Sequence, residues 1–288
     1  MMVVGKLRIG TAGIPTSTKP RSSQNAIKHL AELGLRHMEL EFVRGVRMSE
    51  ATALELRKLT EEHDISLTVH APYYVNLNSA EPEKIVASKE RIIQAAQVGA
   101  WAGAKSVTFH PAYYHEDDPE EVYTRVRDQM ADMLETLERE GINIRLSPET
   151  TGGLSQFGTL EELVRLGVDL PGVYPCVDFA HLFARSIGEF NSYEHFAGAL
   201  QLIQDQLGTQ ALREQHIHLS GIEYGPKGER NHLPLAETEL DYQAVLQALV
   251  DFNVGGWLTC ESPILEEDAL ILQDLYEQLD KENMGGNI

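Results

Sequence analysis

The amino-acid sequence predicts an α/β fold, a single (β/α)8 TIM barrel, and three observations lead to this fold class. Short apolar runs rich in β-branched residues alternate with longer stretches of helical periodicity, which is typical of repeated βα units around a parallel sheet. Eight such units follow one another along the chain. The length of 288 residues also suits one barrel, which commonly needs about 250 residues. We therefore expect one domain over residues 1–280 and a flexible tail over 281–288.

The apolar runs place the predicted strands, and capping and stop signals place the predicted helices. We expect strands at residues 7–10, 37–42, 66–70, 106–110, 143–149, 173–178, 216–219 and 256–261. We expect helices at 22–33, 49–63, 82–102, 119–140, 159–166, 193–207, 241–252 and 266–279. Prolines open two of these helices, and Gly34 and Gly141 end two of them. In such a barrel, functional groups lie at the C-terminal ends of the strands.

The composition is that of a soluble globular protein, with 42% hydrophobic and 24% charged residues. No apolar run reaches the length of about 18 residues that a membrane span needs. The first residues show no basic region followed by an apolar segment, so we expect a cytoplasmic location. Cys176 and Cys260 lie in apolar runs without a CxxC pair, which predicts reduced, buried thiols.

The charge balance restricts the possible partners. The chain carries 24 basic and 44 acidic residues, a formal net charge of −20. This surplus opposes a broad electrostatic footprint for nucleic acid. A nucleic-acid function would therefore need local positive charge from metal ions and from a few arginines in loops.

Six predicted strands carry a metal-competent side chain to the same end of the barrel. These residues are His70, His110, Glu149, Asp178, His218 and Glu261, and His181 follows Asp178 by three residues. A lone histidine at a strand end is more often a hydrogen-bonded structural residue than a ligand. Six ionisable groups in one cleft would repel and lose solvation without a cation, which a divalent metal supplies. The mixture of imidazole and carboxylate predicts zinc, with manganese or iron as alternatives.

The other histidines are interpreted separately. His216 and His218 alternate by two along one strand, so they point the same way, and only His218 should reach the barrel mouth. We expect His216 to pack behind the site. His115 lies in a loop near the mouth, and its role is left open. The remaining histidines are expected to be structural or solvated, namely His29, His37, His63 and His195.

The ordered motifs LTVHAPYYVNL, VTFHPAYYH, SPETTG, CVDFAH, HIHLS and CESP resemble the endonuclease IV family of apurinic/apyrimidinic endonucleases, within the xylose-isomerase-like barrels. The resemblance runs from about Gly10 to Glu261. It implies that His70 and His110 bind one zinc ion and that Glu149 bridges to a second one. The second zinc would be held by Asp178, His218 and Glu261, and His181 would serve a third.

The loop after the seventh strand departs from the family pattern. The family completes its third metal site with an Asp-x-His element, whereas this loop reads Gly228-Glu229-Arg230-Asn231-His232. His232 is a candidate ligand, but the residue two positions before it is Arg230. Aligning Glu229 with the aspartate puts Asn231 where the histidine belongs. The third metal is therefore left open, and Arg230 is either a substrate contact or a solvated loop charge.

The resemblance implies a zinc-dependent hydrolase that cleaves DNA 5′ to abasic sites in base excision repair and leaves a 3′-hydroxyl. A bridged metal pair suits phosphodiester hydrolysis, with Glu149, Glu261 and His110 as catalytic residues. Tyr73 and Tyr74 are candidates to fill the gap left by a flipped abasic nucleotide. Arg44 and Arg47 are candidates to hold phosphates. The expected partner is duplex DNA with abasic sites, bound by a monomer.

Two alternatives remain. A sugar isomerase or epimerase with this barrel needs one divalent metal, and Glu149, Asp178, His218 and Glu261 alone would hold it. The discriminating residues are His70, His110 and His181, which such a site does not need. They favour the nuclease, while the net charge of −20 and the altered loop favour the rival and its small-molecule sugar substrate. The second alternative is a metal-bearing barrel that binds damaged DNA or a partner without cleavage.

Overall fold

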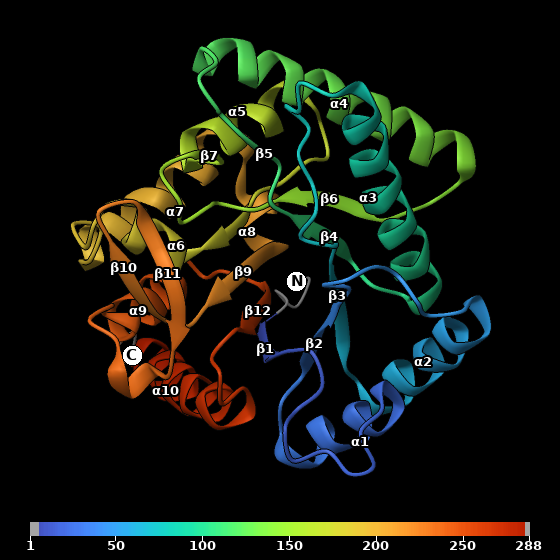
Figure 1. Cartoon of the computed structure of the whole chain (residues 1–288). Helices are drawn as coiled ribbons and strands as arrows, with labels where there is room; N and C mark the ends of the chain where they lie inside the picture. Colours follow the sequence, from blue (N-terminus) through green and yellow to red (C-terminus); the bar gives the residue numbers. More distant parts are fainter. Residues whose placement is uncertain (1–5, 286–288) are drawn as a thin grey trace.

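A computed structural model describes residues 6–285 and contains an eight-stranded parallel sheet that curls into a barrel (Figure 1). The strand order is β6-β4-β3-β2-β1-β12-β9-β8. The barrel closes between β6 and β8 through a parallel bridge of Glu149 with Cys176. The strands are β1 (Leu7–Ala12), β2 (His37–Glu41), β3 (Ser66–His70), β4 (Ser106–Phe109), β6 (Arg145–Pro148), β8 (Cys176–Asp178), β9 (Gln215–Leu219) and β12 (Gly256–Cys260). The predicted fold class is confirmed.

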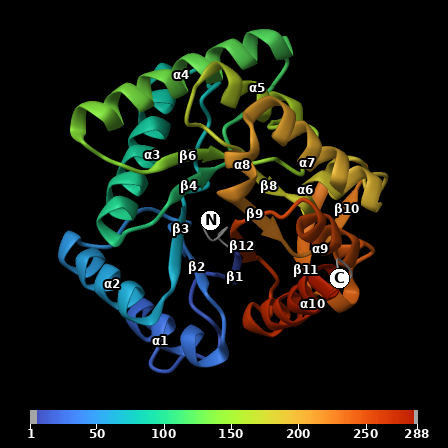
Figure 2. The ribbon, with the colours of Figure 1, turned by 180° about the vertical axis from the view of Figure 1, so that it is seen from behind.

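Helices surround the barrel, as the view from behind also shows (Figure 2). The long ones are α1 (Ser23–Leu33), α2 (Glu50–His63), α3 (Pro82–Ala102), α4 (Pro119–Glu140), α5 (Leu160–Asp169), α7 (Tyr193–Leu207), α9 (Tyr242–Asp251) and α10 (Glu266–Gly285). Local sequence explains their limits. Thr159 and Glu162 form a capping box at the start of α5, and Gly141 in the left-handed conformation ends α4.

The core has an apolar layer between sheet and helices and a partly polar barrel interior. Alternate residues of each strand face the helices, as the fully buried Met38 does. The interior contains buried polar side chains from several strands, including His37, Glu39, Thr68 and His218. This polar interior lies directly beneath the residues that end the strands. The fold therefore supports any strand-end site with hydrogen-bonding groups instead of an apolar plug.

Several elements of the structure were not predicted. A hairpin of β10 (Gly221–Gly225) and β11 (Gly228–Leu233) follows β9, and β5 (Ala112–Tyr113) pairs with β7 (Gln156–Phe157). Two short helices, α6 (Phe179–Arg185) and α8 (Thr209–Arg213), and the 3-10 turn η1 (Leu235–Glu237) complete the described elements. β10 and β11 lack the apolar run that marks the predicted strands, and the other elements are too short for a periodic pattern.

The C-terminal helix extends further than predicted. Residues 281–285, expected to belong to a flexible tail, continue α10. Pairs four residues apart hold this last part: Gln278 donates to Glu282, and Lys281 lies 3.8 Å from Glu277. Residues 286–288 of the predicted tail and 1–5 of the predicted domain lie outside the described residues. Within residues 6–285, no helix combines the length and apolar character that crossing a membrane requires.

Candidate metal centre

The C-terminal ends of six barrel strands bring histidine and carboxylate side chains together. His70 ends β3 and Asp178 ends β8, whereas His110, Glu149 and Glu261 each follow directly after their strands. His218 is the fourth residue of β9. Their ligand atoms fall into overlapping groups in which all atoms lie within 4.8 Å of one another. The strand-end residues predicted from the sequence thus meet at one place.

The first group consists of His70, His110 and Glu149. The Nε2 atoms of His70 and His110 lie 3.2 and 3.4 Å from Glu149 Oε2. His70 Nδ1 lies 2.7 Å from the backbone oxygen of Ala71, so Nδ1 carries the proton and donates. This hydrogen bond leaves Nε2 of His70 with a lone pair directed at the group. The arrangement offers two nitrogens and one oxygen to a cation.

The second group consists of Glu149, Asp178, His218 and Glu261. Here the other oxygen of Glu149 takes part, because Oε1 lies 3.2 Å from His218 Nδ1. The same nitrogen lies 3.5 Å from Glu261 Oε2. The two oxygens of the Glu149 carboxylate therefore face different groups. One carboxylate oxygen would thus be available to a cation in each group.

Unpartnered oxygens show that these residues fit metal ions. Glu149 Oε2, Asp178 Oδ2 and Glu261 Oε2 are buried and accept no hydrogen bond among residues 6–285, although a histidine nitrogen lies within 3.5 Å of each. Burying ionised carboxylate oxygens without a partner is costly, and coordinated cations remove that cost. Each of the three carboxylates contributes one such atom. The set of imidazole nitrogens and carboxylate oxygens suits zinc and related transition metals.

A third group contains Asp178, His181 and His232, and an irregularity in the β10–β11 hairpin brings Glu229 to it. Glu223 pairs with Asn231 and Tyr224 pairs with Glu229, so Arg230 is an extra residue in β11. Such a bulge puts residues three apart on the same face of a strand. Glu229 carboxylate oxygens lie 3.4 Å from His181 Nε2 and 3.9 Å from His232 Nε2. The bulge thus absorbs the altered spacing of the loop.

The same bulge turns Arg230 away from this group. Arg230 Nη1 lies 3.2 Å from Glu223 Oε1, and its side chain is largely exposed. On the facing side, the hairpin rests against Gly152. A Cβ at Gly152 would lie 2.7 Å from the Glu229 Cβ and 3.1 Å from His181 Cδ2. Glycine at this position therefore allows Glu229 and His181 to approach each other.

The second and third groups share the start of α6. Asp178 caps this helix by accepting a hydrogen bond of 2.8 Å from the backbone nitrogen of His181. His181 Nδ1 lies 2.9 Å from the backbone oxygen of Thr150, so Nδ1 donates and Nε2 is left to face Glu229 and His232. The start of α6 therefore fixes the positions of the Asp178 and His181 side chains relative to each other.

Without a cation, protons on the histidines compensate the carboxylates. Burial alone would raise the pKa of Glu261, but His218 holds that pKa at about 2. Burial alone would lower the pKa of His70, yet Glu149 and Glu41 raise it to about 10. Burial raises the pKa of Asp178 to about 6. In the metal-free chain, protons on the histidines thus supply positive charge to the centre. A metal ion can take their place.

The predicted substrate contacts surround this mouth. The Tyr73 ring lies 4.9 Å from the His70 ring and is 48% exposed, while Tyr74 is 70% exposed. Arg44 and Arg47 are exposed and border, with Glu41, a hollow of about 430 Å³. Neither arginine side chain has an ion-pair or hydrogen-bond partner in the described part of the chain.

Sequence reasoning missed Glu39, Glu41 and Glu229. Glu39 and Glu41 alternate in β2, so both carboxylates point into the barrel, and two acidic residues at alternate positions of a buried strand are a readable signal. Glu229 was considered only through a fixed spacing, which the bulge invalidates. The histidines expected to be structural or solvated, and His115, lie outside the three groups described above.

The chain matches the family described as xylose isomerase-like TIM barrels over residues 27–279. The match covers most of the chain, and the protein belongs to this family. Its strand-end ligands lie where barrels of this architecture hold functional groups.

Two sequence relatives and two solved structures are similar to this chain, and the structures share its fold. The chain is 44% identical over 273 residues to an uncharacterized protein of Methanocaldococcus jannaschii, covering 95% of this chain and 98% of that one. It is 29% identical over 234 residues to a probable endonuclease 4 of Symbiobacterium thermophilum, covering 78% and 81%. A D-tagatose 3-epimerase-like protein superposes with a TM-score of 0.72 at 18% identity, covering 95% and 99%. Endonuclease IV from Thermus thermophilus gives a TM-score of 0.70 at 20% identity, covering 94% and 99%.

Proposed function

We propose that this protein is a zinc-dependent phosphodiesterase of the endonuclease IV type that cleaves DNA 5′ to abasic sites. The observation that carries the proposal is the orientation of Glu149, whose two oxygens face two separate ligand groups. A two-metal arrangement suits an in-line displacement at phosphorus. The similarity to probable endonuclease 4 proteins supports the same reaction class.

The ligand groups assign the residues that would hold the metals. His70, His110 and Glu149 would hold one ion, and Glu149, Asp178, His218 and Glu261 the second. Such a pair lowers the pKa of a shared water and stabilises the attacking and leaving oxygens. Glu261 would help to hold the second ion and would also accept a hydrogen bond from the attacking water through its carboxylate. His110 and Glu149 fix the cluster.

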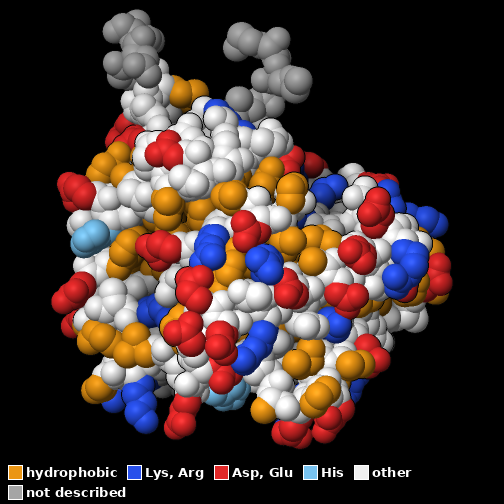
Figure 3. Space-filling view, turned by 90° about the horizontal axis from the view of Figure 1, so that it is seen from above, with side chains coloured by type: hydrophobic (Ala, Val, Ile, Leu, Met, Phe, Trp, Pro, Cys, Tyr) orange, Lys and Arg blue, Asp and Glu red, His pale blue; other side chains and the backbone are white. Residues whose placement is uncertain are grey.

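Substrate binding in this proposal uses the aromatic and cationic residues around the mouth. Tyr73 and Tyr74 offer exposed rings beside His70 that can occupy the space of a missing base. Arg44 and Arg47 supply unpaired positive charge for backbone phosphates. Elsewhere, Lys and Arg are interspersed with Asp and Glu, as on the face in Figure 3. Affinity for DNA would thus depend on contacts at the mouth.

A second candidate function is epimerisation or isomerisation of a sugar at a single metal. The observation that favours it is Glu41, a mouth-side carboxylate whose buried Oε1 has no partner among the described residues. Burial raises the pKa of Glu41 to about 8, so near neutral pH its carboxyl group can both donate to and accept from a sugar hydroxyl. The net charge of −20 points the same way. Glu149, Asp178, His218 and Glu261 would then suffice as ligands.

One experiment separates the two functions. Purified chain loaded with zinc is assayed for nicking of a duplex with one abasic site and, in parallel, for epimerisation of a ketose panel, with and without chelator. We expect chelator-sensitive nicking. Replacing His110 with Ala should reduce nicking at least about 100-fold, because even residues behind metal ligands typically contribute 10–100-fold.

The control is His195→Ala, which removes an exposed imidazole outside the three groups. This variant should nick like the parent. Chelator-sensitive epimerisation without nicking would replace the proposal with the second candidate. Tight binding of abasic duplex without either reaction would indicate the non-catalytic barrel, and nicking by His110→Ala at the parent rate would remove His110 from the catalytic residues.

A further inference from the structure

A carboxylate that the proposed reaction does not use lies beneath the metal groups. Glu39, in the middle of β2, is fully buried. Thr68 Oγ1 donates to its Oε2 at 2.5 Å, and His216 Nε2 lies 2.7 Å from the same oxygen. Its other oxygen, Oε1, lies 2.9 Å from His218 Nε2. A buried carboxylate needs such partners, because its ionised form is otherwise strongly destabilised by the loss of water.

The imidazole of His218 lies between this carboxylate and the metal groups. Nδ1 faces Glu149 Oε1 at 3.2 Å and Glu261 Oε2 at 3.5 Å, whereas Nε2 faces Glu39. Both ring nitrogens thus lie close to carboxylate oxygens, and a metal ion in the second group would take the place of the proton on Nδ1 while the proton on Nε2 stays beside Glu39. With the proton on Nε2, metal binding uses the lone pair of Nδ1. We propose that Glu39 is a positioning residue that sets the tautomer and orientation of His218 for metal binding.

His216 gives this carboxylate a fixed position. Its Nδ1 lies 2.9 Å from Ser106 Oγ, while its Nε2 faces Glu39. With Nδ1 accepting from the Ser106 hydroxyl, the ring carries its proton on Nε2, which faces Glu39 Oε2. Together with Thr68, this ring restricts the carboxylate from the side away from His218. The two histidines on one face of β9 thus have separate roles. His218 would bind the metal, and His216 holds the Glu39 carboxylate in position.

The proposal rests on the metal centre but not on either candidate reaction. A carboxylate behind a metal-binding histidine fixes the ring and makes its free nitrogen more basic. Both effects act on the affinity for the ion, whatever substrate the ion then meets. Metal binding is therefore the appropriate measurement, and it remains informative for a chain that binds zinc but does not nick DNA.

The test compares zinc binding by the parent, Glu39→Gln and Met38→Ala, each as the full chain. The amide of Gln keeps one acceptor oxygen and presents hydrogens on its other side, so it cannot serve as acceptor for both His216 and His218. In Glu39→Gln, we expect the zinc site that contains His218 to bind zinc about 10–100-fold less tightly than in the parent. Competition with a chromogenic chelator measures this affinity. Met38→Ala is the matched control, because Met38 is the adjacent buried residue of β2 on the helix-facing side. It should lower the thermal midpoint while leaving zinc affinity unchanged.

A spectroscopic measurement separates positioning from general destabilisation. In zinc-loaded parent chain, ring nitrogen shifts of His218 should report a metal-bound Nδ1 and a protonated Nε2, and Glu39→Gln should lose this pattern. Glu39→Asp keeps the carboxylate but moves it one methylene away from His218. We expect this variant to bind zinc with intermediate affinity. It provides a second test if the Gln variant does not fold. Parent-like zinc affinity in either folded variant would overturn the proposal. A parent chain that binds no zinc would overturn the metal centre and the proposal with it.

Discussion

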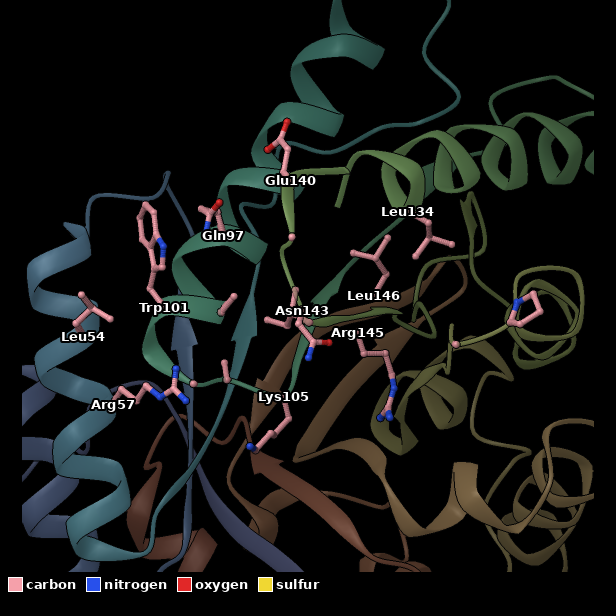
Figure 4. A pocket seen from close by; sticks show the side chains of 17 residues that line it. Leu54, Arg57, Gln97, Trp101, Lys105, Leu134, Glu140, Asn143, Arg145 and Leu146 are labelled. Carbon is pink, nitrogen blue, oxygen red and sulfur yellow. The ribbon is translucent and has the colours of Figure 1, made fainter. Parts of the chain in front are cut away.

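The two ends of the barrel differ in how their charged groups are satisfied. At the N-terminal end, a hollow of about 930 Å³ lies among α2, α3, α4 and the loops that precede β4, β6 and β8 (Figure 4). Arg57 lies 3.1 Å from Glu61, and Arg145 pairs with Glu214 and lies over the Tyr174 ring. At the C-terminal end, buried carboxylate oxygens have no partner among residues 6–285.

The larger hollow is therefore not the better candidate site. Its cations are largely balanced by neighbouring acids, and the C-terminal ends of α3 and α4 add negative partial charge there. No further charge is required to stabilise that end. At the other end, several carboxylates converge without enough protein donors, and positive charge must come from protons or metal ions. The carboxylates that lack protein donors therefore indicate the candidate site, whereas the volume of the hollow does not.

Metal loading should give the largest difference between the two ends. His70 has a folded pKa of about 10 against about 6.5 in the unfolded chain, so its stabilising contribution is complete below pH 6.5 and is lost as pH rises through 10. This loss applies to the metal-free protein, because a bound metal replaces the proton. Free zinc at 100 times its dissociation constant adds about 2.7 kcal/mol per site.

We therefore expect the difference in unfolding free energy between zinc-loaded and metal-free protein to widen from pH 6.5 to pH 9. Denaturant unfolding at several pH values, with and without chelator, measures it. At the acidic end, Glu261 contributes stability above pH 4.5 that is lost as pH falls through about 2. Parallel pH profiles for the two forms would contradict the view that protons and metal ions substitute for one another.

An intermediate effect is expected from Gly152→Ala, which tests the third group alone. The added methyl would overlap Glu229 and His181, so the hairpin must shift, at a cost of about 1–3 kcal/mol. Zinc stoichiometry should fall by one in a parent that binds three ions, while the two-ion cluster stays intact.

The matched substitution is Gly198→Ala in α7, where a Cβ would meet nothing within 4 Å. It should stabilise the protein by about 0.5–1 kcal/mol, since alanine is the better helix former. Metal counts by elemental analysis and midpoints by denaturant unfolding give both readouts. Unchanged metal content and stability in Gly152→Ala would show that the hairpin tolerates displacement from His181.

The smallest effect is expected at the N-terminal hollow. Lys105 is exposed, and its ammonium has no ion-pair or hydrogen-bond partner in the described range. Lys105→Ala should change unfolding free energy by no more than about 0.5 kcal/mol and leave zinc content and nicking as in the parent. Reduced nicking by Lys105→Ala would show that the N-terminal hollow contributes to activity, contrary to the comparison of the two ends.

The sequence predicted the barrel because strands and helices of this length carry strong periodic signals. The limits of α3, α4 and α7 agree with the predicted ranges, since proline, glycine and serine mark their ends. The same logic placed candidate ligands such as His70 and Asp178 together, because parallel strands deliver their C-terminal residues to one rim.

Other parts of the centre depend on pairing that a single sequence does not display. Glu39 acts through contacts with β3 and β9, which are distant in sequence and become neighbours only in the folded sheet. The position of Glu229 depends on a hairpin irregularity, and turn type and bulge position leave little trace in composition. Local rules therefore located the ligands on the regular strands and missed those that depend on tertiary pairing.

The bulge at Arg230 also affects how related chains should be compared. Because the extra residue Arg230 points away from the third group, Glu229 and His232 both face His181 although two residues separate them. A search pattern with a rigid gap would reject this chain although its side chains converge in the same way. A bulge of this kind lets the hairpin carry an extra residue on its solvent side while Glu229 and His232 keep a common face toward His181.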